Sequence, residues 1–169
     1  MDEAEALDIM YADEKAYYLD VSEDGLTKDY QLVGYGITSN GKTMNPQSET
    51  KQYVNQKTAT TVVNSYQVEY PFEGEIIRND KVIKFLYDIV ENETLGKKLQ
   101  RSLVTFDFPE GESPNLTNVS AKERIVSIEI SEMTREAGNT IKISGSFKAV
   151  TDLVDGTFNV TTRAFTKGS

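Results

Sequence analysis

The sequence predicts a mainly β fold: a two-sheet β-sandwich or half-barrel that carries one packed α-helix and one long extended loop. Apolar and polar residues alternate along most of the chain, which is the period of strands with one buried face. A single segment instead repeats its apolar residues every three or four positions, as an amphipathic helix does. A long polar stretch separates two alternating segments. With 169 residues the chain can bury a core of its own, so we expect one domain over residues 1–169.

The alternating segments are the predicted strands. In residues 65–73 one face carries Tyr66, Val68, Tyr70 and Phe72, while Gln67, Glu69 and Pro71 lie on the other. The same alternation indicates strands in residues 126–130, 141–149 and 158–164, and β-forming residues favour strands in 15–21 and 103–108. The sequence thus predicts seven or eight strands in all.

The helical period covers residues 80–93. Its apolar positions include Val82, Phe85, Leu86 and Ile89. Asn79 or Asp80 can cap the start, and Gly96 lies where a stop is expected. We therefore expect one helix here, with Asp88, Glu91 and Glu93 on its solvated side.

Three stretches lack a pattern that would face a core: an acidic arm over residues 1–14, a loop over 109–121 and a long polar insertion over 39–61. The insertion contains Asn40-Gly41, which favours a tight turn, and Asn45-Pro46, with few apolar residues such as Met44, Tyr53 and Val54. Polar loops longer than about fifteen residues are usually functional or disordered. The insertion is therefore either an arm that becomes ordered against another subunit or a flexible linker.

Composition disfavours several classes of function. Lys and Arg total 18 against 27 Asp and Glu, a net charge of -9 that should repel nucleic acid. The chain has no Cys and no His, which removes thiolate chemistry and the commonest general base and metal ligand. We expect no enzyme activity, cofactor or metal site. The acidic group Asp20, Glu23 and Asp24 fits a turn better than a calcium loop, because it lacks the regular ligand spacing. The N-terminus lacks the features of a signal peptide, and we expect no membrane association and a cytoplasmic origin.

Residues 36–92 resemble the major tail proteins, or tail tube proteins, of long-tailed bacteriophages. The resemblance lies in the order of four features: a loop with Asn45-Pro46, a polar stretch over 53–61 that ends in Thr residues, a strand with aromatic residues over 62–72, and a short helix that an acidic residue opens over 80–88. It covers about a third of the chain well. The C-terminal strands match the family only in being strands.

The resemblance implies self-assembly into hexameric rings that stack into a tube, through which DNA passes without specific binding. It also implies tape measure, tail tip and terminator proteins as partners, a place in the virion tail, and assembly in the cytoplasm of a bacterial host. We expect contacts between rings from the insertion, through Asn40, Gly41, Met44, Asn45, Pro46, Tyr53 and Val54. We expect Val82, Phe85, Leu86 and Ile89 to make the helix a brace at the ring interface or outer wall.

Open sheet edges support self-assembly on independent grounds, because unpaired backbone groups must be covered or paired with another chain. Two other interpretations remain open. One is a monomeric β-sandwich module that binds a carbohydrate or another ligand through its long loop. The other is the related tube of a contractile tail, which needs a sheath as partner.

Overall fold

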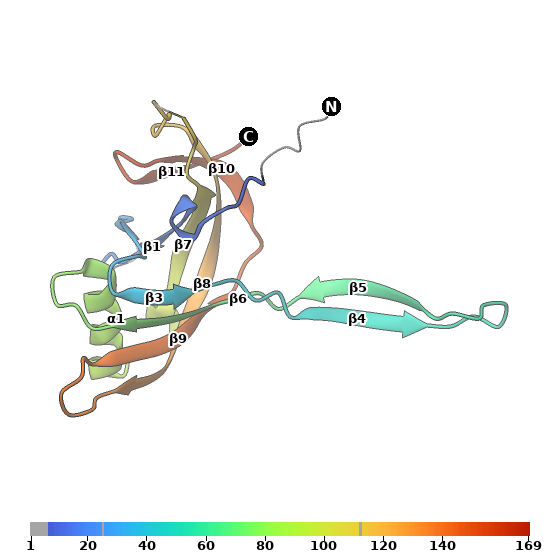
Figure 1. Ribbon diagram of the computed structural model, residues 1–169, viewed down its shortest axis with the longest axis horizontal. Helices are drawn as coiled ribbons and strands as arrows, with labels where there is room; N and C mark the ends of the chain where they lie inside the picture. Colours follow the sequence, from blue (N-terminus) through green and yellow to red (C-terminus); the bar gives the residue numbers. More distant parts are fainter. Residues whose placement is uncertain (1–6, 25, 112) are drawn as a thin grey trace.

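A computed structural model describes residues 7–24, 26–111 and 113–169. Figure 1 shows a mainly β body with one helix and a long hairpin that leaves it, which confirms the predicted fold class. The strands of the body are β1 (Lys15–Asp20), β2 (Tyr30–Leu32), β3 (Ile37–Asn40), β6 (Glu69–Glu75), β7 (Gln100–Asp107), β8 (Val119–Thr134), β9 (Lys142–Ala149), β10 (Val154–Asn159) and β11 (Ala164–Lys167). The hairpin consists of β4 (Pro46–Lys51) and β5 (Thr60–Tyr66). The helix is α1 (Lys81–Asn92), and two short 3-10 helices are η1 (Ala12–Glu14) and η2 (Gly96–Leu99).

The long strand β8 organises the sheet of the body. The strand order is β2-β1-β7-β8-β9-β6-β3, all antiparallel, and β10 pairs with both β8 and β11. One edge of β8 pairs with β7, while the other edge pairs with β10 near its start and with β9 over the rest. The sheet therefore divides along β8, and its two branches can cover different faces.

Strands β1 and β7 bury side chains on both faces. Leu19 and Leu103 belong to a core on the side of α1, whereas Tyr18 and Val104 belong to a second core on the opposite side. A strand that is covered on both faces has no need for polar alternation. This explains why the two segments read as β-forming runs without a polar face.

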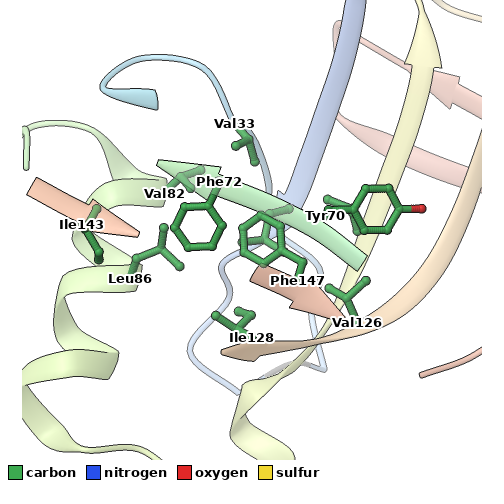
Figure 2. Packing of buried hydrophobic residues seen from close by; sticks show 11 residues of the cluster. Val33, Tyr70, Phe72, Val82, Leu86, Val126, Ile128, Ile143 and Phe147 are labelled. Atoms are coloured by element: carbon green, nitrogen blue, oxygen red, sulfur yellow. The ribbon is translucent and has the colours of Figure 1, made fainter. Parts of the chain in front are cut away.

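The core on the helix side lies between α1 and strands β6, β8 and β9 (Figure 2). The rings of Phe72 and Phe147 stack with their centroids 4.7 Å apart. Val82 and Leu86 reach them from the helix. The alternation in the sequence correctly predicted the inward positions of Tyr70 and Phe72 on β6 and of Ile143 and Phe147 on β9.

Helix α1 begins and ends close to the predicted limits. The carboxylate of Asp80 accepts hydrogen bonds from the backbone N–H groups of Val82 (2.9 Å) and Ile83 (3.1 Å), which otherwise lack partners in a first turn. The helix stops at Glu93, whose backbone is left-handed with φ of 47°. The N-cap is thus the predicted Asp80.

The second core is aromatic. Phe158 of β10 lies against Tyr18 and Phe106, with ring centroids 4.8 and 5.3 Å away, and meets the Tyr30 ring edge-on. Because β10 brings Phe158 to this face, the second branch of the sheet closes over β1 and β7.

The predicted strand over 158–164 is wrong, because the chain turns within it. The side-chain oxygen of Asn159 accepts from the N–H groups of Thr161 (3.0 Å) and Thr162 (3.1 Å), and Arg163 has a positive φ of 57°. Asn side chains stabilise turns in this way. The turn joins β10 to β11, so Phe158 and Ala164 lie on different strands.

The long polar insertion expected over residues 39–61 contains strand structure. Ser39 and Asn40 end β3, and the rest of the segment enters the hairpin, which runs on to Tyr66. The backbone groups of β4 and β5 pair with one another, and β5 is rich in Thr and Val, which are enriched in strands. Tyr66 consequently belongs to the hairpin rather than to the predicted body strand over 65–73, of which β6 is the observed part.

Asp20 organises the turn between β1 and β2. Its fully buried carboxylate accepts hydrogen bonds from the N–H groups of Ser22 and Asp29, each 3.1 Å away, and pairs with Lys28 at 3.5 Å. Asp24 accepts from the N–H groups of Leu26 and Thr27. These carboxylates therefore hold backbone groups of a turn. In the part of the chain that the structure describes, no helix is long and apolar enough to span a membrane.

Candidate assembly surfaces

The hairpin leaves the body at a defined point. Thr43 and Glu69 exchange backbone hydrogen bonds of 2.7 and 2.9 Å, and the Asn45 side chain donates to the Gln67 carbonyl at 3.0 Å. Beyond this point the two strands extend away from the body, and no other element accompanies them in Figure 1. The described chain therefore offers the hairpin no surface of its own to pack on.

Every residue of β4 and β5 is exposed. The exposed residues between positions 44 and 66 include six large apolar side chains: Met44, Tyr53, Val54, Val62, Val63 and Tyr66. An isolated two-stranded hairpin is marginally stable at best in water. Apolar side chains that gather on such an element indicate a surface that another chain covers.

The register gives the hairpin two different faces, because directly paired residues project to the same side. One face carries the pairs Pro46 with Tyr66, Ser48 with Val63, and Thr50 with Thr61, whose hydroxyl oxygens are 3.0 Å apart. The opposite face carries the pairs Gln47 with Ser65, Glu49 with Val62, and Lys51 with Thr60. A bulge between Gln47 and Ser48 keeps Tyr66 and Val63 on one side. We call the first side the uncharged face.

The predicted assembly residues divide between body and hairpin. Asn40 ends β3, and the N–H of Gly41 donates to the Pro71 carbonyl at 3.1 Å, so both lie on the body. Met44, Asn45 and Pro46 lie at the base of the hairpin. Tyr53 and Val54 lie at its tip, so the lengths of β4 and β5 separate the two groups. The structure therefore separates this set into three places.

Sequence reasoning missed Val62, Val63 and Tyr66 as candidate contact residues. Alternation placed Tyr66 in the same body strand as Tyr70 and Phe72, and the resemblance placed Val62 and Val63 in a strand that leads into it. The sequence carries no clear hairpin signal here, because residues 46–51 have no alternating apolar positions and residues 52–59 are longer than a common hairpin loop of about two to five residues.

The predicted helix residues face inward. Val82 and Leu86 are buried in the core, and Phe85 and Ile89 pack against it. The guanidinium of Arg101 covers the Phe85 ring, 5.0 Å from its centroid, and donates to the Ser22 carbonyl. These side chains brace the helix on its own sheet, so any contact of α1 with another copy would use its exposed side, which includes Lys84 and Asp88.

Three strands of the body have one paired neighbour each among the described residues: β2 with β1, β3 with β6, and β11 with β10. Their second edges carry N–H and C=O groups that another strand can pair with. The outermost strands of the main sheet path, β2 and β3, lie at its opposite ends. This arrangement permits a head-to-tail contact between copies.

The face of β3, β6, β9 and β8 that points away from the helix is acidic. Its outward positions carry five carboxylates and two ammonium groups: Glu69, Glu73, Glu75, Glu129, Glu132, Lys142 and Lys148. Lys148 pairs with Glu129 at 2.8 Å, and the remaining outward positions of β9 are Ser144 and Ser146. Glu73, Glu75 and Glu132 line one shallow cavity of about 280 Å³. We call this surface the acidic face.

Comparisons with known proteins identify the fold. No family model matches the sequence, and no curated protein matches it. Among solved structures, the SPP1 tail tube aligns with a TM-score of 0.63 at 15% identity, over 87% of this chain and 78% of that chain. The tail of the empty GTA particle, refined with C6 symmetry, aligns with a TM-score of 0.56 at 7% identity, over 86% of this chain and 97% of that one. The chain therefore has the fold of phage tail tube proteins.

Proposed function

We propose that this protein is a structural subunit that polymerises with copies of itself into the tail tube of a phage. The observation that carries the proposal is the exposed hairpin, an element with apolar side chains and no core, on a body that has the tail-tube fold. The role is mechanical, without turnover. Its place is the virion tail, after assembly in the host cytoplasm, with tape measure, tail tip and terminator proteins as further partners.

The hairpin makes the contact between rings. Its uncharged face, with Tyr66 and Val63, can lose water without the cost of burying a charge. The charged face, with Glu49 and Lys51, stays toward solvent. Because the hairpin projects from the body, a contact through it lies along one direction and repeats to give a filament.

Rings close through the sheet edges. Pairing of the free edge of β3 with that of β2 or β11 in a neighbour satisfies the backbone groups of both copies. Such a contact between different surfaces closes into a ring when the rotation divides evenly. The C6 symmetry of the GTA tail supports six copies in each ring.

The acidic face lines the lumen. It is the broad side of the sheet that the helix leaves uncovered, and its side chains are carboxylates, Ser and a minority of Lys. A wall with net negative charge repels DNA and prevents it from binding while it passes. This agrees with the overall charge of -9.

Replacing residues 46–66 by Asn-Gly tests the proposal. The dipeptide joins Asn45 to Gln67, whose backbones already pair with an N–H to carbonyl distance of 3.2 Å, and Asn-Gly favours a two-residue hairpin turn. We expect the natural chain to form rings and tubes in negative-stain micrographs as its concentration rises. The shortened chain should keep the circular dichroism of the folded body but form no tubes.

A matched control retains the hairpin and changes Lys51→Gln on its charged face, which should leave tube formation intact. Tubes of normal length from the shortened chain would contradict the role of the hairpin. A natural chain that stays a monomer of 18.9 kDa at every concentration would contradict the whole proposal and favour a monomeric ligand-binding module.

A further inference from the structure

One end of the helix-side face carries a cluster of cations that the helix leaves uncovered. Leu19 of β1 and Val126 of β8 belong to the helix-side core. The side chains two and four residues farther out on the same face of these strands are Tyr17 and Lys15 on β1, and Arg124 and Lys122 on β8. Lys42, at the base of the hairpin, lies over the ring of Tyr70 with its ammonium 5.9 Å from the centroid.

Arg124 forms the buried end of this cluster. It is 8% exposed, and its Nε and Nη1 atoms have no hydrogen-bond partner. A buried charged donor without a partner destabilises the folded chain, because its lost hydration is not replaced. Buried guanidinium groups are normally paired with carboxylates or phosphates. The guanidinium also makes a hydrogen bond with the Tyr70 side chain, so within the isolated chain its Nε and Nη1 atoms are the donors that lack an acceptor.

Two other cations of the cluster are already paired with carboxylates. Lys15 pairs with Asp107 at 3.0 Å, and Lys122 pairs with Asp155 at 2.5 Å. No ion pair within the described ranges involves Lys42 or Arg124. Burial and the charges of Arg124, Lys15 and Lys122 lower the pKa of Lys42. Two positive charges are therefore uncompensated at one place on a chain whose net charge is -9.

The N-terminal segment has the complementary chemistry. Residues 1–14 contain six acidic residues and no basic one. Its described part also exposes four large apolar side chains: Leu7, Ile9, Met10 and Tyr11. In its own chain this part lies beside carboxylates instead, because Asp8, Met10 and Glu14 line a groove with Asp107 and Glu110. Its own body therefore does not neutralise it there.

We propose that the N-terminal segment of a second copy docks on this cluster and places a carboxylate between Arg124 and Lys42, with the partly exposed Tyr17 beside its apolar side chains. This deepens the proposed function, on which it rests, by naming a second contact between copies besides the hairpin. The bound carboxylate supplies an acceptor for the Nε and Nη1 atoms of Arg124. It also offsets the repulsion between Arg124 and Lys42.

A peptide-binding measurement tests the site directly. A fluorescein-labelled peptide of residues 1–14 is titrated with the full chain, at concentrations where sedimentation shows no tubes, and its anisotropy is followed. We expect saturable binding that weakens as salt rises, and no binding of a peptide whose acidic residues are replaced by Asn and Gln. Lys42→Gln should weaken binding about tenfold, the loss of one charge-assisted hydrogen bond.

Lys148→Gln is the matched control, since it removes a cation from the acidic face and should leave the affinity unchanged. Arg124→Gln should abolish binding, and thermal unfolding checks that this buried substitution preserves the fold. If that variant unfolds, the exposed Lys42 still decides the outcome. Equal affinities of the Lys42→Gln and Lys148→Gln variants, or binding of the acid-free peptide, would overturn the inference.

The two proposals fail separately. If the natural chain forms tubes but Lys42→Gln leaves the affinity for the peptide unchanged, only the docking of the N-terminal segment is overturned. Specific peptide binding without tubes or rings at any concentration would support the docking site and overturn the proposed tube.

Discussion

Strands β5 and β6 follow one another along the chain and differ completely in environment. On β6, Tyr70 and Phe72 are buried against the helix-side core. On β5, Tyr66 and Val63 have similar chemistry, yet the Tyr66 side chain is 55% exposed. The short segment between the two strands thus separates the body, which its own core stabilises, from the hairpin, which has no core. We therefore expect mutations in the body to reduce the stability of the monomer, and mutations in the hairpin to impair assembly without changing that stability.

The largest effect on stability is expected in the body. Phe147→Ala removes a fully packed ring that stacks on Phe72, and truncation of a buried Phe costs about 3–5 kcal/mol. Urea unfolding of the monomer, followed by circular dichroism, measures the loss. A loss below about 1 kcal/mol would show that this core is not what stabilises the body.

The second-largest loss of stability is expected when the buried carboxylate of Asp20, which organises the turn between β1 and β2, is removed. Asp20→Ala leaves the N–H groups of Ser22 and Asp29 without their acceptor and should cost about 1–3 kcal/mol. Glu23→Ala, in the same turn and exposed, is the control and should cost little. Equal unfolding midpoints for the two variants would contradict the role of Asp20.

The buried carboxylate of Asp20 also predicts how the free energy of unfolding changes with pH. Burial by itself would raise the pKa of Asp20, but hydrogen bonds from Asp29 and Ser22 and the charge of Lys28 together hold it below its usual value. A lowered pKa in the folded state stabilises the protein above the unfolded pKa, near 4, and this contribution is lost as pH falls through the folded value. The free energy of unfolding should therefore drop more steeply below about pH 4 in the natural chain than in Asp20→Ala.

A smaller effect is expected at the helix cap. Asp80→Ala removes the acceptor for two N–H groups of the first turn and should cost about 1 kcal/mol. Asp80→Ser, which can still cap, should recover most of it. If Ala and Ser behave alike in thermal unfolding, the cap does not contribute as described.

The smallest effect on the stability of the monomer is expected in the hairpin, where the effect on assembly is greatest. The double variant Val63→Ser and Tyr66→Ser changes only exposed side chains, so the free energy of unfolding should move by less than about 0.5 kcal/mol. Tube formation should nevertheless be lost. Val62→Ser on the opposite face is the control and should assemble. Loss of tubes in both variants would contradict the preference for the uncharged face.

The sequence predicted those parts whose physics is local. Asp80 and the helical period located α1 because capping and amphipathic packing act within a few residues. Alternation located the inward residues of β6 and β9. It failed for 158–164, where the Asn159 side chain makes a turn that periodicity alone does not reveal.

The hairpin and the cation cluster depend on distant parts of the chain. Tyr66 and Tyr70 belong to the same alternation, but Tyr70 is buried because β6 pairs with β9 and contributes to the core that α1 covers, whereas Tyr66 is exposed. In the same way Lys42, Arg124 and Lys15 lie far apart in sequence, and the sheet register brings them together. No local pattern predicts either site.

Hydrogen exchange of the backbone N–H groups of β5 and β6, before and after assembly, tests the contrast between hairpin and body most directly. We expect the N–H groups of β6 to be protected in the monomer while those of β5 exchange fast, and assembly to slow exchange in β5 by about tenfold or more. Protection of β5 that is the same in monomers and in assembled material would contradict this expectation.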